Sequence, residues 1–360
     1  MDFKEQLMHY KKLVEEDIEK FFVEKQKKFG YRDEFVNEAI EVLKDYTLRG
    51  GKRLRSTLIT MTYRGYSGDL SDTKIIRPSS SVEFMQSYLL THDDLMDEAL
   101  IRRNKPTPHV WIADWYKKKI ENNDKKAKKF GSDMAIVLGD IFNNFGVECL
   151  LEADFPAERK LEACWIYNNT AETTGKGQLL DIWFSMRKGK PVTEQDHLNV
   201  IDRKTVEYTI EKPMLMGAAL ANVPEAERKI IHNYAFPLGR AFQLQDDLLD
   251  YYASEEKLGK AVLTDLREGK HTIVLIKALE KATPEQKKFL MSMVGKYNPS
   301  EEEIERVRKI IKDTGSYDYS KKIIDDYINE SKKWIDKMHC SQELKDFCWG
   351  FADYMAKREY

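Results

Sequence analysis

The sequence predicts an all-α fold, a single bundle of antiparallel helices. Apolar residues recur every three or four positions along most of the 360-residue chain, which is the period of a helix with one buried face. Runs that alternate apolar and polar residues between hairpin turns, which would indicate strands, are missing. Most links between helical segments are short, and short links favour antiparallel neighbours in one bundle. Hydrophobic residues make up 42% of the chain, which is enough for one large core.

Each expected helix is justified by its apolar period and by the glycine or proline that ends it. The expected helices are residues 5–26, 34–48, 53–66, 79–101, 132–152, 159–186, 194–222, 227–252, 271–281, 286–295, 301–313, 317–337 and 341–358. Two prolines, Pro213 and Pro237, lie inside these segments, and we expect each to kink or break its helix.

One domain covering residues 1–360 is the simplest organisation, with a motif-bearing core at about 30–282 and peripheral helices at about 283–360. Helix 5–26 either packs as a cap or contributes to a subunit contact. The segment from Lys117 to Lys129 is polar and mostly basic. We interpret it as a solvated loop, with an anion or membrane contact as the alternative.

Composition excludes several classes of protein. The formal net charge of -2 does not suggest a general nucleic-acid binder. The four cysteines have no zinc spacing, which favours reduced thiols in a reducing cytoplasm. The N-terminal residues are charged and do not resemble a secretory signal, and the longest apolar run, Met214 to Ala221, is too short to cross a bilayer. We therefore expect a soluble, cytoplasmic protein without a transmembrane segment.

The most informative motif is an acidic triplet, Asp93, Asp94 and Asp97, followed by Arg102-Arg103. On a helix, Asp93 and Asp97 point the same way and Asp94 lies about 100° round the axis. Carboxylates this close repel one another unless a cation lies between them, and Mg²⁺ prefers oxygen ligands. Carboxylates for a metal beside arginines for phosphate indicate a site for a metal-bridged diphosphate.

The same spacing occurs again at Asp246, Asp247 and Asp250. A single triplet in a chain with 61 acidic residues is compatible with a solvated helix face. Two copies, each directly after an apolar helical run, favour metal binding, because carboxylates at the end of a buried stripe do not belong to a solvated face.

Glycines accompany basic residues elsewhere. Gly50-Gly51 precede Lys52, Arg53 and Arg55, and two glycines allow positive φ angles where a new helix offers free N–H groups. This indicates an anion pocket, with an ordinary basic helix start as the alternative. Three further patterns are compatible with either function or ordinary structure: Gln178 with Asp181 on one helix face, Lys204-Thr205 inside a helix, and Gly259-Lys260 with Gly269-Lys270.

Together these motifs resemble those of the trans-isoprenyl diphosphate synthases, the family of farnesyl and geranylgeranyl diphosphate synthases. The matching motifs are Gly50 to Arg55, Asp93 to Asp97 with Arg102-Arg103, Gly177 to Asp181, Lys204-Thr205, Gly239 to Asp250 and Gly259-Lys260. The resemblance implies a bundle around a deep central cavity, working as a homodimer. It also implies a prenyltransferase of isoprenoid and lipid synthesis that condenses isopentenyl diphosphate with allylic diphosphates.

The resemblance implies roles for single residues. Asp93, Asp97 and Asp246 would ligate Mg²⁺, three ions in the family with Mn²⁺ as a substitute, and Asp94, Asp247 and Asp250 would be further ligands or support. Arg102, Lys204, Thr205, Gln243 and Lys260 would contact the allylic diphosphate, and Lys52, Arg55, Gln86 and Arg103 would hold isopentenyl diphosphate. The residues expected to be catalytic are Asp93, Asp97, Lys204 and Asp246.

The implied chemistry suits these residue types. Metal ions and basic side chains stabilise a departing diphosphate and leave an allylic cation, which the double bond of isopentenyl diphosphate attacks. In the family's mechanism the released diphosphate takes the proton, which accounts for the lack of an obvious side-chain base. Three single positions depart from the family pattern: Gln86 stands where many members have His, and Asn104 and Leu263 stand where Gly is common. The tripeptide Tyr251-Tyr252-Ala253 is also unusual after the second triplet. These departures leave the local loop geometry open.

Product length is implied by the residues before the first triplet, where bulky side chains form the cavity floor in this family. Tyr88 is five residues before Asp93, about 7.5 Å along a helix, with Leu89 one residue nearer and Met85 one turn deeper. This resembles geranylgeranyl-type enzymes, so we predict a twenty-carbon product. A farnesyl or longer product is the alternative, and Tyr88 is also compatible with an ordinary core tyrosine.

Two other functions compete with this interpretation. Terpene cyclases and head-to-head synthases also use aspartate-rich helices, but they generally lack the Gly-Gly-Lys-x-x-Arg start that begins at Gly50 here. Non-catalytic synthase subunits lose acidic residues, whereas this chain keeps all six. The sequence leaves open the preferred starter and the role of the basic segment 117–129.

Overall fold

The computed structural model describes residues 1–29, 33–69, 71, 74–187, 191–252, 262–296 and 298–357. Within these ranges the chain is helical apart from loops and one short hairpin, so the all-α fold expected from the sequence is confirmed. The chain divides into two compact units, each described here by itself. The first is Met1–Tyr167 with Met216–Val223, and the second is Asn168–Leu215 with Pro224–Tyr360.

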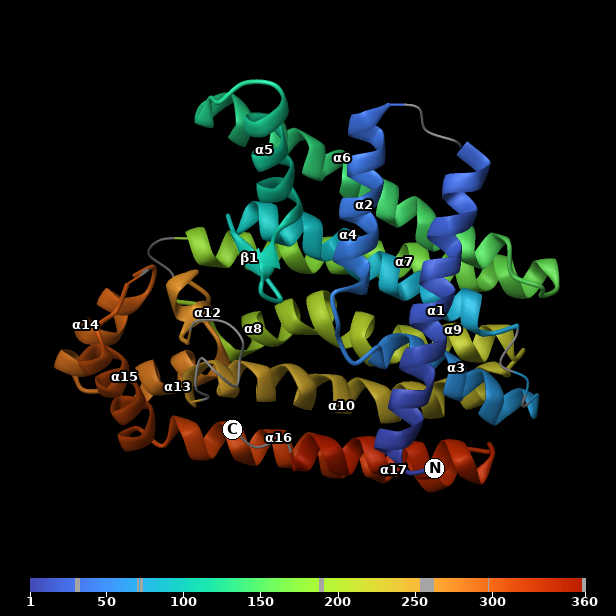
Figure 1. Cartoon of the computed structure of the whole chain (residues 1–360). Helices are drawn as coiled ribbons and strands as arrows, with labels where there is room; N and C mark the ends of the chain where they lie inside the picture. The colour runs from blue at the N-terminus through green and yellow to red at the C-terminus, as the bar shows by residue number, and fades with distance from the viewer. Residues whose placement is uncertain are drawn as a thin grey trace. The chain divides into compact units, whose positions relative to one another are not determined.

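The first unit is organised around α4, which packs along α6 and contacts α1, α2 and α3 (Figure 1). A two-residue hairpin follows α4 directly, and α5 packs on α6. The elements of this unit are α1 (Phe3–Phe29), α2 (Glu34–Leu48), α3 (Leu54–Ser67), α4 (Ile76–Met96), β1 (Ile101–Arg102), β2 (Lys105–Pro106), α5 (Pro108–Lys119) and α6 (Asp124–Leu151), and α7 (Ala157–Met186) begins in it.

An aromatic cluster attaches α1 to the rest of the first unit. The rings of Phe21 and Phe84 lie 4.8 Å apart between centroids, and those of Phe21 and Phe145 lie 5.1 Å apart. Burying each such ring stabilises the fold by about 1.5–3 kcal/mol. Helix α1 therefore packs as a cap on this unit, the first of the two roles expected for it.

The second unit is organised around α10, with the π-helix η1 and α16 packed along it (Figure 1). The buried Tyr234 of α10 donates to the Cys348 carbonyl and accepts from Ser331 through its own backbone carbonyl. The elements are α8 (Glu194–Ile201), η1 (Asp202–Glu211), α9 (Lys212–Leu220, which ends in the first unit), α10 (Glu225–Tyr252), α12 (Thr264–Arg267), α13 (Ile273–Lys281), α14 (Pro284–Met293), α15 (Glu301–Asp313), α16 (Ser316–Lys332), the 3₁₀ turn η2 (Ile335–Lys337) and α17 (Gln342–Ala356).

Pro213 and Pro237 were expected to kink or break their helices, and neither proline breaks its helix. Pro237 lies inside α10, which continues to Tyr252. Before Pro213 the chain widens into the π-helix η1, where the Lys212 N–H bonds the Glu207 carbonyl five residues back. The wider turn accommodates a residue that has no N–H to donate, so the chain stays helical.

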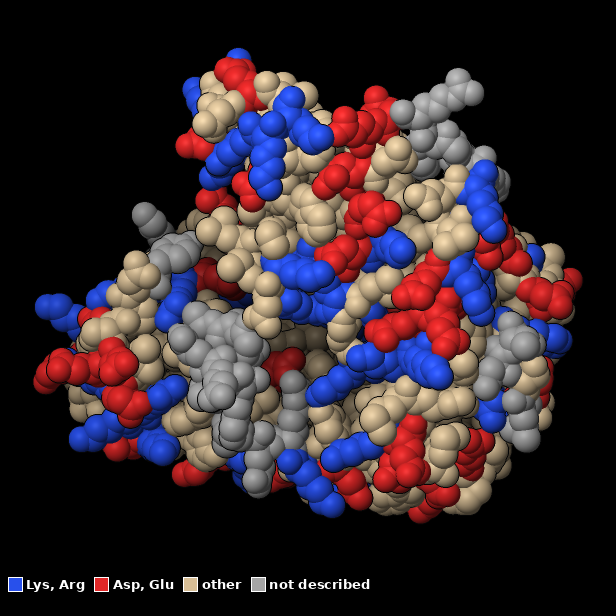
Figure 2. All heavy atoms as spheres, in the orientation of Figure 1, with Lys and Arg blue, Asp and Glu red and all other residues tan. Residues whose placement is uncertain are grey.

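The interpretation of residues 117–129 as a loop was wrong, except for the four residues 120–123. Helix α5 extends to Lys119 and α6 begins at Asp124, where the Asn123 side chain accepts from the Lys126 N–H. Lys117 pairs with Asp124 at 2.6 Å. Over α5, basic side chains stand beside acidic ones in Figure 2, so this surface is a pair of helix ends with mixed charge.

By length and composition α6 is apolar enough to cross a membrane, the one such helix among the described residues. Its most apolar window is 44% buried, and the helix packs on α4 and α5. Core helices commonly pass the same test, so this feature is a weak indication.

Candidate active site

The turn between α2 and α3 carries the basic residues expected to bind an anion. Gly50 and Gly51 have φ angles of 74° and 101°, which an L side chain adopts only with strain. A Cβ atom on Gly51 would also lie 3.2 Å from the Arg103 guanidinium. Glycine is therefore needed here for its backbone angle and for close approach.

Two side chains of this turn and α4 meet directly. Arg55, at the start of α3, donates from Nη1 to the Gln86 Oε1 atom at 3.0 Å. Lys52 is exposed at the turn, whereas Arg55 and Gln86 are half-buried. An arginine beside an amide at a helix start offers several N–H donors at one place, which suits the oxygens of a diphosphate.

The hairpin after α4 brings Arg103 to the same turn. Arg103 and Asn104 occupy its two central positions with φ angles of 53° and 61°. The Arg103 Nη1 atom donates to the carbonyls of Gly50 at 3.0 Å and Arg49 at 3.2 Å. Burial, followed by the charge of Arg53, lowers the pKa of Arg103 below its ordinary value. Of the four residues expected to hold isopentenyl diphosphate, Arg55, Gln86 and Arg103 are thus gathered around this turn, and Lys52 lies on it.

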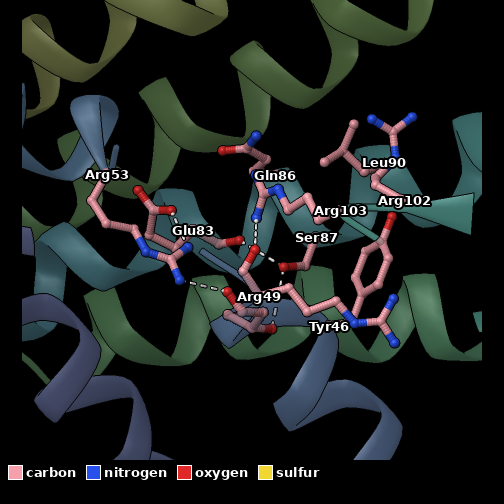
Figure 3. Close-up of a pocket in the computed structure, with 10 residues that line it drawn as sticks. Tyr46, Arg49, Arg53, Glu83, Gln86, Ser87, Leu90, Arg102 and Arg103 are labelled. Carbon is pink, nitrogen blue, oxygen red and sulfur yellow. Dashed lines mark hydrogen bonds and ion pairs between the residues drawn. The ribbon is translucent and has the colours of Figure 1, made fainter. Parts of the chain in front are cut away.

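Gln86 and Arg103 also line a small pocket (Figure 3). Its side chains leave about 10 Å³ between them, enough for about one water molecule. The arginines that line it are therefore packed against their neighbours. The lining residues are Tyr46, Thr47, Arg49, Arg53, Glu83, Gln86, Ser87, Leu90, Arg102 and Arg103.

The first acidic triplet lies at the end of α4, and its members differ in burial. Asp94 is fully buried, and both of its oxygens accept hydrogen bonds. Arg102 Nε donates to Oδ1 at 2.6 Å, and the Tyr46 hydroxyl donates to Oδ2 at 2.6 Å. Asp93 and Asp97 are half-buried, and Asp97 is the C-cap residue that follows α4.

The electrostatics of this trio follow from burial. Burial alone would lower the pKa of Arg102, but the hydrogen bond and charge of Asp94 raise it above the ordinary value. Burial and the charge of Asp94 raise the pKa of Tyr46. Arg102 therefore stays a cation and Tyr46 a neutral donor across the physiological range.

The second triplet lies near the end of α10. Asp247 is buried, and its carboxylate accepts from Gln243 Nε2 at 2.7 Å and lies 3.1 Å from His197 Nε2. Asp250 is buried and accepts from the Thr264 hydroxyl and from the Asp265 N–H. Asp246 is half-buried.

Lys204 and Thr205 lie on the π-helix η1. Lys204 Nζ donates to Asp181 of α7 at 2.7 Å, and burial of Asp181 is outweighed by Lys204 and Lys270, so its pKa is lowered. A Cβ on Gly177 would lie 2.5 Å from the Lys204 nitrogen, so this glycine allows α7 and η1 to pack closely. Asp181 thus pairs with Lys204, while the Gln178 Oε1 atom is buried with no partner among the described residues. Lys260 and its neighbour Gly259 lie outside the described residues.

The residues expected to form the chain-length floor lie on different sides of α4. Met85 is fully buried, and Leu89 and Tyr88 are half-buried. The Tyr88 ring packs edge-on against His92 with 5.0 Å between centroids, and His92 Nε2 lies 3.1 Å from the Ile136 carbonyl of α6. Tyr88 therefore leans toward α6. On an ideal helix it is about 140° round from Asp93, whereas Leu89 is about 40° away.

The sequence reasoning missed three site residues, Tyr46, Glu83 and His197. It named Arg53 as a basic residue of the turn but did not predict that its side chain is buried. Glu83 carried a usable signal, because it lies one helical turn before Gln86 on the same face of α4. The contacts of Tyr46 and His197 join segments 48 and 50 residues apart, and their neighbouring residues gave no indication of them.

No three His, Cys, Asp or Glu side chains among the described residues stand close enough together to hold a metal ion by themselves. The half-buried carboxylates nevertheless fit Mg²⁺, because proteins usually bind this ion through one or two carboxylates together with substrate phosphates and water. The donor set is oxygen only, which is also the set that Mg²⁺ and Mn²⁺ prefer.

Comparison with known proteins identifies close relatives. A model of the polyprenyl synthetase family matches residues 37–311. The geranylgeranyl diphosphate synthase of Methanosarcina mazei is 31% identical over 312 residues, which cover 86% of this chain and 87% of that protein. The geranylfarnesyl diphosphate synthase of Natronomonas pharaonis is 28% identical over 334 residues, with 86% and 87% covered.

A solved structure agrees with this relationship. It is the geranylgeranyl pyrophosphate synthase from Corynebacterium glutamicum complexed with isoprenyl diphosphate and magnesium. The two chains match with a TM-score of 0.90 at 25% sequence identity, covering 100% of each.

Proposed function

The chain belongs to the polyprenyl synthetase family and is a prenyltransferase, and we propose that it joins isopentenyl diphosphate to allylic diphosphates to make geranylgeranyl diphosphate. The resemblance to trans-isoprenyl diphosphate synthases is thereby confirmed, and the substrates and the product length are the proposal. The glycine turn at the start of α3 carries it, because this turn gathers Arg55, Gln86 and Arg103 next to the helix that bears the first triplet.

The two substrates would use different parts of the site. Lys52, Arg55, Gln86 and Arg103 hold the diphosphate of isopentenyl diphosphate. Arg102, Lys204, Thr205 and Gln243 hold the allylic diphosphate, together with Lys260. Arginine and lysine suit these tasks because they present charged donors to phosphate oxygens. Holding both substrates in a fixed orientation removes much of the entropic barrier to carbon–carbon bond formation.

Bound Mg²⁺ would neutralise the charge that develops on the departing diphosphate. Asp93, Asp97 and Asp246 are the proposed ligands, because these three carboxylates are half-buried. Asp94, Asp247 and Asp250 support them, since their buried oxygens already accept protein donors. The proposal includes three bound Mg²⁺ ions and the ability of Mn²⁺ to replace them.

The proposal includes no side-chain base for the proton that the condensation releases. The released diphosphate is therefore the proposed acceptor. Arg102 remains charged throughout, so its role is to hold the diphosphate while the bond breaks.

Product length is proposed to be twenty carbons, in line with the Methanosarcina mazei relative. The geranylfarnesyl relative makes twenty-five carbons the second candidate. The orientation of Tyr88 bears on this choice, because its ring leans toward α6 and His92. Leu89 and Met85 lie nearer the Asp93 face, so the floor is proposed to include all three side chains.

A homodimer is proposed from exposed apolar side chains on the part of α7 that lies in the second unit. Leu179 is 70% exposed, Trp183 58% and Met186 76%, and their spacing places them on one helix face. Large apolar side chains grouped in this way mark an interaction surface. The single-domain organisation, the cytoplasmic location and the absence of a transmembrane segment stay predictions.

A product assay tests the proposed function. Purified protein is incubated with Mg²⁺, labelled isopentenyl diphosphate and, separately, the five-, ten- and fifteen-carbon allylic diphosphates, and products are sized by chromatography. We expect elongation that stops at twenty carbons. In Tyr88→Ser and Leu89→Ser we expect longer products, with the larger change at the residue that faces the growing chain. Absence of elongation with every starter would contradict the proposal.

A further inference from the structure

Arg53 lies between two residues proposed to bind isopentenyl diphosphate, yet it is placed quite differently from them. Lys52 is exposed and Arg55 is half-buried, whereas Arg53 is only 5% exposed. Its backbone is left-handed, with φ 51° and ψ 37°, a conformation that costs a residue with a side chain about 1–2 kcal/mol. A long basic residue keeps such a conformation only where the surrounding contacts hold it.

Those contacts come from three separate elements. Arg53 Nε donates to Glu15 of α1 at 3.1 Å, Nη1 donates to Glu83 of α4 at 2.9 Å, and Nη2 donates to the Thr47 carbonyl at the end of α2 at 2.8 Å. Figure 3 shows the Arg53 guanidinium turned toward the Glu83 carboxylate. Each of the three nitrogens thus donates to a protein acceptor, and the side chain is buried among those acceptors.

Glu83 completes the arrangement. It is 3% exposed, and its second oxygen accepts from the Ser56 hydroxyl of α3 at 2.9 Å. Glu83 and Gln86 are three residues apart and share one face of α4. Removing one partner of a buried ion pair leaves an uncompensated charge, which costs about 3–5 kcal/mol, so the pair holds α3 and α4 in a fixed relation.

We propose that Arg53 is a positioning residue for isopentenyl diphosphate, acting through Glu83 and Glu15 without touching the substrate. The inference rests on the proposed function. By anchoring the left-handed residue that starts α3, Arg53 fixes the direction of Lys52 before it and Arg55 after it. By anchoring Glu83, it fixes the face of α4 that presents Gln86 to Arg55.

The same contacts give the N-terminal helix a part in substrate binding. Glu15 lies on α1, before the region 37–311 that the polyprenyl synthetase model matches. Its carboxylate is one of the two that compensate the Arg53 charge. Helix α1 is thus coupled to the turn electrostatically as well as through the aromatic cluster around Phe21.

Steady-state kinetics with each substrate varied separately test the proposal. In Arg53→Met we expect the KM for isopentenyl diphosphate to rise about tenfold, equivalent to about 1.4 kcal/mol of binding energy, with the KM for the allylic diphosphate within about twofold. Arg53→Lys keeps the charge but loses the planar fork, so an intermediate KM is expected. Glu15→Gln should give a smaller rise than Arg53→Met, because the Glu83 contact remains.

Arg77→Met is the matched control. Arg77 also joins α4 to α1, through Asp17 at 2.9 Å and Glu24 at 3.0 Å, but it contacts no residue of the turn. This variant should lower the melting temperature and leave both KM values unchanged. Calorimetric titration of isopentenyl diphosphate into each protein then measures binding without turnover.

Three results would overturn the inference. One is a folded Arg53→Met with an unchanged KM for isopentenyl diphosphate. Another is an equal rise of both KM values, which would indicate a general loss of structure. If Arg53→Met does not fold, Arg53→Lys decides in its place, and an unchanged KM there refutes the proposal. A wild-type chain that neither elongates any starter nor binds isopentenyl diphosphate overturns the proposed function as well, so the two failures are distinguishable.

Discussion

Asp94→Asn tests whether the middle carboxylate of the first triplet supports Arg102 or binds metal. Asparagine keeps the size of the side chain and can still accept from Arg102 Nε, while its amide can donate to the Tyr46 hydroxyl. What is lost is the negative charge beside a guanidinium whose side chain is 32% exposed. A charge-assisted hydrogen bond contributes about 1.5–3 kcal/mol, and solvent screening at this exposure reduces the loss to about 1–2 kcal/mol.

The assay has two readouts. Thermal unfolding should show a melting temperature lower by about 1–3 °C, because the unfolding entropy of a 360-residue chain gives a shift of about 1.3 °C per kcal/mol. Turnover should fall by about tenfold or more, because Arg102 loses the carboxylate that orients it toward the allylic diphosphate. The Mg²⁺ concentration for half-maximal rate should stay within about twofold of wild type, since Asp94 offers no free oxygen to an ion.

Tyr46→Phe is the control for stability. It leaves the buried Oδ2 of Asp94 without this donor, at a cost of about 1–3 kcal/mol, but keeps the ion pair with Arg102. It should therefore destabilise the fold as much as Asp94→Asn and reduce turnover less. A shift of the Mg²⁺ requirement in Asp94→Asn as large as that in Asp97→Asn would refute the assignment of Asp94 to support.

Three further predictions concern single positions. Gly51→Ala should raise the KM for isopentenyl diphosphate, because φ is 101° and the new Cβ meets the Arg103 guanidinium at 3.2 Å; steady-state kinetics measure this, and an unchanged KM would contradict it. Leu263→Gly should lower the free energy of unfolding in urea, because the loss of a fully buried leucine, about 2–5 kcal/mol, exceeds the roughly 1–2 kcal/mol regained from its φ of 55°. His232 has its pKa raised above 6.5 by the hydrogen bond that its Nδ1–H donates to the Glu211 carboxylate, so its stabilisation is complete below pH 6.5 and is lost as pH rises through the folded pKa. Melting temperatures of wild type and His232→Gln should therefore converge as the pH is raised, and a constant difference would show that the pair does not titrate.

Local sequence rules predicted the helices well because an apolar stripe and a terminal glycine are both short-range signals. They failed where a tertiary contact decides the outcome. Pro213 was expected to kink or break its helix, and a break does not occur, because the preceding residues form a π-helix that packs along α10. The basic stretch after Lys117 was interpreted as a loop because its charge suggested solvent, although its lysines lie on the surfaces of two helix ends.

Two of the departures from the family pattern lie at positions where the backbone has a positive φ angle. Asn104 and Leu263 stand where glycine is usual, and both have positive φ angles, 61° and 55°. Asparagine tolerates this conformation, whereas leucine keeps it here while being fully buried. The glycine that is usual at these positions thus indicated a positive φ angle. Whether an asparagine or a leucine can adopt that angle depends on tertiary packing, which cannot be read from one sequence.

The two acidic triplets show why identical spacing did not predict identical sites. Helix α4 ends at Met96, so Asp97 is the C-cap residue after it, and its side chain is half-buried. Helix α10 continues past the second triplet to Tyr252, and Asp250 is buried beneath a segment that supplies Thr264 and Asp265 as donors. The first triplet therefore offers two half-buried carboxylates and the second offers one. The first two aspartates of each triplet are alike in burial, so the place where the helix stops accounts for the difference at the third aspartate alone.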